Sequence, residues 1–146
     1  MINISHRGNI NGRNVKKENS PEYILSALEQ GYECEIDVWF IKDQWFLGHD
    51  NPTYKIDEDF LKDKRLWCHA KSIGSLVEML KESDIHCFWH QEDDVTLTSQ
   101  QYIWTYPDKL IWGGNAIAVL PELYNSDIER CVGICSDYIG RYGLPE

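Results

Sequence analysis

Short segments in which apolar and polar residues alternate recur along the chain, and this period of two predicts strands with one buried face. Residues 2–6 and 32–40 show the pattern most clearly, and in the second segment carboxylates alternate with Cys34, Ile36 and Val38. Residues 43–50 follow a turn and are expected to form the arm of a hairpin. Further strands, each ending in a polar residue or a turn signal, are expected at 66–71, 85–91, 101–107, 116–122 and 131–140, with 110–112 as one more candidate.

Two segments have the spacing of apolar residues that is typical of a helix. Residues 19–31 predict a helix with Ser20 as its N-cap, Pro21 at its first position and Gly31 beyond its end. A second helix is expected after residue 72, where the apolar residues at helical spacing are Ile73, Leu76, Val77 and Leu80.

The order of these elements is strand, helix, strand, strand, helix and then closely spaced strands, which predicts a mainly parallel sheet with crossover connections. We expect an α/β protein with a compact TIM-type (β/α) barrel. A full barrel of this type takes about 250 residues. The chain has 146 residues, so several outer helices must be reduced or missing. An open parallel sheet is the alternative. No linker or repeat divides the chain, and we expect residues 1–146 to form a single domain.

The composition narrows the choice of partners and of cellular compartment. A formal net charge of −10 argues against a nucleic-acid partner, because nucleic acids carry the same sign of charge. No run approaches the ~18 consecutive apolar residues of a membrane span, and we find no secretory signal at the N-terminus. We therefore expect a cytoplasmic protein whose five cysteines are reduced and buried, and the sequence leaves its oligomeric state open.

Polar residues stand where the predicted strands end, and in a barrel these ends meet at the mouth that carries the active site. Glu35 and Asp37 are two residues apart on one strand, so their side chains project from the same face. Two such oxygen ligands suit Mg²⁺ or Ca²⁺. His6 and His49 also stand at strand ends, and two histidines that approach a phosphodiester from opposite sides can form an acid/base pair.

Positive charge is concentrated beside His6 although the chain as a whole is acidic. The basic residues of this loop-like stretch are Arg7, Arg13, Lys16 and Lys17. The stretch is either a solvated loop or the rim of a phosphate-binding site, and composition does not decide between the two.

Four short motifs follow one another as HRG at 6–8, ENS at 18–20, EID at 35–37 and GHD at 48–50. In this order and at nearly this spacing they resemble the signature of the glycerophosphodiester phosphodiesterase family, which belongs to the phospholipase-C-like phosphodiesterase barrels. Residues 102–107 and 133–140 look like later strand motifs of the same family, with altered spacing.

This resemblance implies a phosphoric diester hydrolase of lipid metabolism that acts on a small-molecule phosphodiester, either by hydrolysis or as a lyase that leaves a cyclic phosphate. It also implies one divalent metal ion, Mg²⁺ or Ca²⁺, with Mn²⁺ also compatible. The implied roles are acid/base catalysis by His6 and His49, phosphate contacts from Arg7 and Lys71, an apolar wall from Trp104, and metal ligation by Glu35 and Asp37.

His69 marks a departure from the family pattern, because it stands where the family has a third carboxylate ligand, two residues before Lys71. We expect His69 to ligate the ion directly. An imidazole in place of a carboxylate shifts the preference toward Mn²⁺, Co²⁺ or Zn²⁺ over Ca²⁺. The alternative function is a non-catalytic phosphate-binding barrel whose metal site has decayed, and His69 is the residue that favours it.

Overall fold

The computed structural model of the protein describes residues 1–124 and 127–143. One sheet contains all ten strands. Its central part is parallel and runs in the order β6-β5-β2-β1-β10-β9-β8. The bounds are β1 Ile2–His6, β2 Glu33–Ile41, β5 Leu66–Ala70, β6 Cys87–Phe88, β8 Ile103–Thr105, β9 Ala116–Val119 and β10 Gly133–Ser136.

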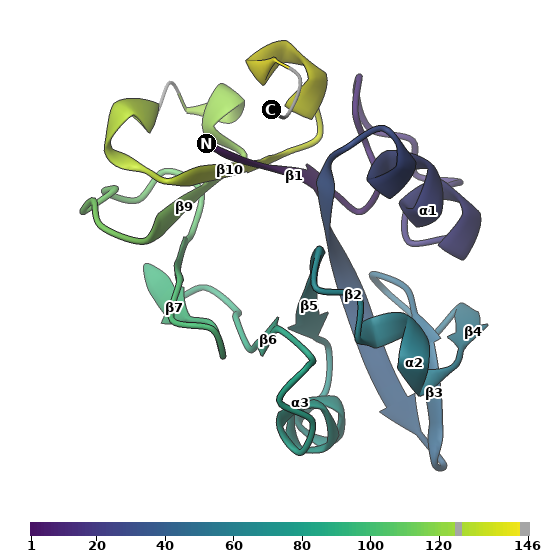
Figure 1. The fold of residues 1–146 in the computed structure, drawn as a ribbon. Coiled ribbons are helices and arrows are strands. Elements are labelled where there is room, and N and C mark those ends of the chain that lie inside the picture. The colour runs from purple at the N-terminus through teal and green to yellow at the C-terminus, as the bar shows by residue number, and fades with distance from the viewer. Residues whose placement is uncertain (125–126, 144–146) are drawn as a thin grey trace.

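Antiparallel strands are added at both sides of this parallel part. β3 (Gln44–Leu47) pairs with the end of β2 and β4 (Tyr54–Ile56) pairs with β3, which confirms the predicted hairpin arm. β7 (Val95–Leu97) pairs with β8. Figure 1 shows the sheet curling into half a barrel, with α1 (Pro21–Glu29), α2 (Glu58–Leu61) and α3 (Ile73–Leu80) outside the curl.

The expectation of a compact TIM-type (β/α) barrel is wrong. The structure is a curled mixed sheet with three short helices in its described part, not a barrel of alternating strands and helices. A parallel crossover that carries a helix takes a dozen or more residues. Only residues 106–115 join β8 to β9, and they include Pro107 and the pair Gly113–Gly114, which disfavour a helix.

In their described residues, the other connections on this side of the sheet also lack an α-helix. The chain between β6 and β8 folds back as β7, and the chain from β9 to β10 contains the 3-10 turns η1 (Pro121–Leu123) and η2 (Ile128–Arg130). A third turn of this kind, η3 (Ile139–Tyr142), follows β10. Within the described residues no ladder joins β6 to β7, so the sheet is open, as in the alternative prediction, but mixed.

The two faces of the sheet have different cores. On the outer face, Cys34, Ile36 and Val38 of β2 pack with Ile24 and Leu28 of α1. The concave face carries a second, partly aromatic cluster of Ile4, Trp67, Phe88, Trp104, Ile117, Val119 and Cys135. The alternation predicted for β2 is therefore confirmed, and it places Glu35 and Asp37 on the face opposite to Cys34 and Ile36.

The predicted helices are confirmed with small changes in length. Ser20 caps α1 by accepting a hydrogen bond from the backbone N–H of Tyr23, with Pro21 at the first position. Ser72 caps α3 in a capping box with Ser75. The last strands are shorter than predicted, since 85–91 and 131–140 reduce to β6 and β10, and 110–112 is not a strand.

Two further predictions concern the whole chain. All five cysteines are unpaired and buried, as expected for reduced thiols. Within residues 1–124 and 127–143, no helix combines the length and the apolar character that crossing a bilayer requires.

Candidate functional site

The turn after β1 presents His6 and Arg7 at the end of the strand. Arg7 lies in the left-handed region with φ of 59°, and Gly8 follows with φ of 97°. A Cβ atom at Gly8 would also collide with the ring of Tyr23. Non-glycine residues adopt this conformation rarely and often at functional sites. The HRG motif therefore forms a tight turn in the backbone directly after His6.

A second turn, after β3, positions His49. Gly48 has φ of 156°, and a Cβ atom there would overlap the backbone oxygen of Asn51. The indole N–H of Trp39 on β2 donates a hydrogen bond of 2.7 Å to the carbonyl oxygen of Gly48. The N–H of Gly48 bonds the carbonyl oxygen of Asp37. These contacts hold the loop that carries His49 against β2.

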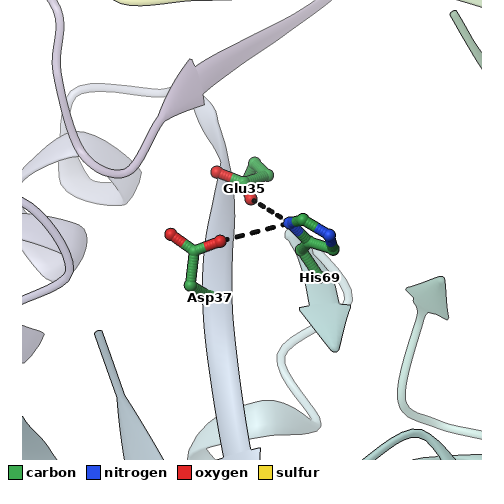
Figure 2. A group of neighbouring side chains, drawn as sticks. All are labelled: Glu35, Asp37 and His69. Atoms are coloured by element: carbon green, nitrogen blue, oxygen red, sulfur yellow. Dashed lines mark ion pairs between the residues drawn. The ribbon is translucent and has the colours of Figure 1, made fainter. Parts of the chain in front are cut away.

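Glu35, Asp37 and His69 face one another on adjacent parallel strands, as Figure 2 shows. Nδ1 of His69 lies 3.2 Å from Oδ1 of Asp37 and 3.7 Å from Oε2 of Glu35. The three residues each offer one ligand atom, and these atoms all lie within 4.8 Å of one another. This group could hold a metal ion.

The hydrogen bond on the far side of the His69 ring fixes its tautomer. Nε2 lies 2.9 Å from the backbone carbonyl oxygen of His90. A carbonyl oxygen only accepts, so Nε2 carries a proton and donates it. The ring also stacks on Phe88 with centroids 5.1 Å apart, which fixes its plane. Nδ1 therefore faces the two carboxylates, where it can donate a proton to Asp37 or, once deprotonated, offer its lone pair to a cation bound between them.

Two oxygens of this group are buried without a hydrogen bond among the described residues, Oε1 of Glu35 and Oδ1 of Asp37. Leaving a buried carboxylate oxygen unpaired is costly. The cis ligands of an octahedral ion with bonds of about 2.1 Å are about 3 Å apart, close to the spacing of Nδ1 and Oδ1. The donor set of two hard oxygens and one imidazole nitrogen therefore fits a divalent ion such as Mg²⁺ or Mn²⁺.

The two carboxylates have opposite pKa shifts. Burial raises the pKa of Glu35 well above its usual value, and repulsion from Asp37 raises it further. Burial also acts to raise the pKa of Asp37, but His49, His69 and Arg7 outweigh it and hold this pKa well below its usual value. The surroundings thus favour the ionised form of Asp37 and disfavour that of Glu35, and further positive charge beside Glu35 would favour its ionised form.

Asp37 is held in place by Asn19 and Arg7. The Asn19 amide donates a hydrogen bond of 2.9 Å to Oδ2 of Asp37 and accepts one of 2.9 Å from the Asp37 backbone N–H. Nε of Arg7 lies 3.2 Å from the same Oδ2, and its Nη1 lies 3.1 Å from Glu18. Because these contacts use Oδ2, the other oxygen, Oδ1, remains directed at His69.

His6 is oriented by Asp137, which follows β10. Nδ1 of His6 lies 2.8 Å from Oδ1 of Asp137, and the amide of Asn9 donates a hydrogen bond of 2.9 Å to the same oxygen. Burial acts to raise the pKa of Asp137, but the bonds from His6 and Asn9 lower it overall. The ionised carboxylate keeps a proton on Nδ1, so Nε2 of His6, 3.8 Å from Glu35, presents its lone pair.

One cavity of about 820 Å³ collects the predicted site residues. Asp37, one of the eight predicted side chains, is buried next to this cavity. The other seven line its walls: His6, Arg7, Glu35, His49, His69, Lys71 and Trp104. The ends of β6, β8 and β9 form the opposite wall with residues such as Glu92, Tyr106 and Leu120.

Sequence reasoning assigned no role to three residues that support the site: Asn19, Glu18 and Asp137. Asn19 and Glu18 belong to the ENS motif that carried the resemblance, so the signal was present in the sequence. Asp137 stands at the end of a predicted strand, within residues 133–140 that also resemble a family motif, but the sequence does not pair it with His6, which is 131 residues away.

Comparisons with protein-family models, with curated proteins and with solved structures gave no match.

Proposed function

We propose that this protein is a metal-dependent phosphodiesterase and that the cavity of about 820 Å³ is its active site. The observation that carries the proposal is that Glu35 and Asp37 each have a buried carboxylate oxygen without a hydrogen bond among the described residues, in a site shared with His6 and His49. The motif resemblance described above supports the same reaction class. Glu35, Asp37 and His69 would hold the ion, which when bound polarises a phosphoryl oxygen as a Lewis acid.

His6 is the proposed general base. Asp137 accepts the Nδ1 proton, so Nε2 is available to take a proton from the nucleophile as it attacks phosphorus. The nucleophile is water in a hydrolysis, or a neighbouring hydroxyl of the substrate in a cyclisation. The bond that breaks joins phosphorus to the oxygen of the leaving alcohol.

His49 is the proposed general acid, which protonates the leaving oxygen. Its side chain is 43% exposed and stands at the cavity wall beside Arg7, in a loop separate from the turn that carries His6. Lys71 lines the same cavity and brings positive charge near Glu35. Arg7 is held by Glu18 and Asp37, so we assign it both a charge that stabilises the phosphoryl oxygens and the positioning of Asp37.

The test is turnover of methyl p-nitrophenyl phosphate and of a panel of glycerophosphodiesters by protein stripped with EDTA and then supplied with Mg²⁺, Ca²⁺ or Mn²⁺. We expect turnover only with added metal, and phosphorus NMR of the products separates hydrolysis from cyclisation. The His6→Ala variant is the matched control for contaminating phosphodiesterases. Metal binding in calorimetry without turnover of any diester would contradict the proposal and favour the non-catalytic phosphate-binding protein.

A further inference from the structure

A second, smaller cavity meets the active-site cavity at two shared residues. It has a volume of about 190 Å³ and lies between residues 13–19 and 48–54. Arg7 and His49 belong to the walls of both cavities. We call the smaller cavity the side groove and define it by Val15, Asn51, Thr53 and Tyr54. The candidate acid and the arginine therefore stand on the boundary between two spaces.

A phosphodiester has two alcohol groups that leave the phosphorus in different directions. Because Arg7 and His49 line both cavities, a phosphoryl group bound beside them would have one cavity available for each alcohol. We infer that the side groove binds one of the two alcohols of the substrate and that it sets the size of that alcohol. This inference rests on the proposed phosphodiesterase function.

The two spaces differ in size and in chemistry. The larger cavity is bordered by Trp104, Tyr106 and Leu120, which suit a bulky or apolar group. The side groove is strongly polar, because charged side chains line it together with hydroxyl and backbone groups: Arg13, Glu18 and Asp50. Thr53 Oγ1 donates to the carbonyl oxygen of Asn51 at 3.1 Å, and Tyr54 carries a hydroxyl. Hydroxyls of this kind can also accept from a ligand.

The volume of the side groove limits the alcohol that it can hold. With about 30 Å³ for each water-sized group, a volume of about 190 Å³ admits an alcohol of about six heavy atoms. A small alcohol with several hydroxyl groups fits this limit and can bond to the polar wall. An aromatic alcohol exceeds the limit and would have to occupy the larger cavity.

Val15 is the residue of the groove wall that can be changed with least effect on folding, because it is 71% exposed. A tryptophan at this position would fill part of the groove from its solvent side. An alanine would widen it. The two changes therefore predict opposite shifts in the size of the accepted alcohol.

The experiment compares p-nitrophenyl phosphodiesters in which the second alcohol is methanol, glycerol or phenol, with Mn²⁺ present. We expect V15W to lower the ratio of kcat/KM for the glyceryl diester over the methyl diester about tenfold, the usual range for blocking a small pocket. V15A should raise the relative turnover of the phenyl diester. V77W serves as the control, because Val77 is 49% exposed on α3 and lines neither cavity.

The outcomes separate this inference from the function on which it rests. Ratios in V15W and V15A that equal those of the wild-type protein and of V77W would overturn the assignment of the groove and leave the phosphodiesterase in place. A wild-type protein that cleaves none of the three diesters would overturn both. Melting temperatures of all variants show whether a change in the ratio of kcat/KM values results from a loss of folded protein.

Discussion

The two walls of the active-site cavity are built in different ways. The wall formed by the ends of β1, β2 and β5 is polar and held by many hydrogen bonds and ion pairs. Asp37, for example, contacts three side chains, those of Asn19, Arg7 and His69. The wall formed by the ends of β6, β8 and β9 rests on very short strands, two residues in β6 and three in β8. Its rings pack on one another, as Phe88 does on Trp104 at 4.6 Å.

This difference indicates that the two walls of the half-barrel have different roles in the proposed reaction. Charges must be fixed within a few tenths of an ångström to bind an ion or to move a proton, and the first wall uses buried hydrogen bonds to do so. The second wall is mixed. Apolar side chains such as Trp104 and Leu120 can exclude water and fit part of the substrate with less precise geometry, and Gln91, Glu92 and Asp93 lie beside them. Changes in the first wall should therefore affect the reaction, and changes in the second should affect fit and stability.

The largest expected effect comes from the two histidines of the first wall. His6→Ala should lower turnover of every diester by roughly 10²–10⁴-fold, the usual loss for a positioned base. His49→Ala should cause a loss of the same size with an alkyl diester, but a much smaller one with a p-nitrophenyl diester, because p-nitrophenolate leaves without a proton. Steady-state kinetics on both substrates, with Trp112→Ala as an exposed control, measures this difference.

If His49→Ala affected the alkyl and the p-nitrophenyl diesters equally, His49 would not be the general acid. If His6→Ala left both rates unchanged, the base would have to be another group, and the bond between His6 and Asp137 would have only a structural role.

The second prediction concerns Asn19, whose φ of 67° is in the left-handed region. Asn19→Gly keeps this backbone conformation accessible but removes both side-chain bonds to Asp37. Metal affinity should fall by roughly 10–100-fold, the usual effect of losing a group that orients a ligand. Calorimetric titration with Mn²⁺ measures it, with Asn115→Gly as the control because Asn115 is exposed and bonds only the backbone of Gln101.

An unchanged Mn²⁺ affinity in Asn19→Gly would mean that Arg7 alone orients Asp37. In that case Arg7→Lys should weaken metal binding, because a lysine cannot reproduce the geometry with which the guanidinium contacts Asp37 and Glu18.

The first wall could be predicted from the sequence far better than the second wall. HRG, EID and GHD are local motifs: alternation fixes the face of Glu35 and Asp37, and glycines mark the turns that present His6 and His49. The curl of the sheet could not be predicted in the same way. It depends on strands of two to four residues, in which alternation is too short to indicate a register, and on loops in the place of helices.

The pairing of His6 with Asp137 could be predicted only in part. It requires β1 and β10 to be neighbours, which the expected closure of a barrel implies for the first and last strands, but no local pattern pairs Asp137 with His6. The buried amide–carboxylate bonds of Asn19 were also missed, because an asparagine before a helix is ordinarily explained by turn formation alone.

The third prediction concerns the pH dependence of stability at His86, which lies directly before β6 and outside the cavity. His86 is 2% exposed and bonds Thr98 at 2.7 Å, and burial lowers its pKa to about 4. The unfolded chain, with a histidine pKa of about 6.5, therefore binds more protons than the folded protein between these values. Stability should fall as the pH drops from 7 to 5, and His86 should account for about 2 kcal/mol of the fall.

Urea unfolding at pH 7 and at pH 5, for the wild-type protein and for His86→Gln, isolates this contribution. The loss between the two pH values should be smaller in the variant by about 2 kcal/mol, whatever its absolute stability. Equal losses in the two proteins would show that the acid sensitivity comes from the carboxylates of the first wall.

The smallest expected effect is a change of metal preference at His69, the residue by which the polar wall departs from three carboxylates. His69→Glu would add a negative charge beside Asp37 and Glu35, which should strengthen Mg²⁺ and Ca²⁺ binding by about tenfold and reduce the relative preference for Mn²⁺. The change requires that Nδ1 itself ligates the ion, as its spacing of 3.2 Å and 3.7 Å from the two carboxylates indicates. His69→Gln is the matched control, because it keeps a polar side chain at the same place without adding charge. Titration of the three proteins with Mg²⁺, Ca²⁺ and Mn²⁺ tests the point. An order of affinities that is the same in all three would place His69 outside the coordination of the metal, as a residue that pairs with Asp37 and Glu35 and is held by the carbonyl oxygen of His90 and the ring of Phe88.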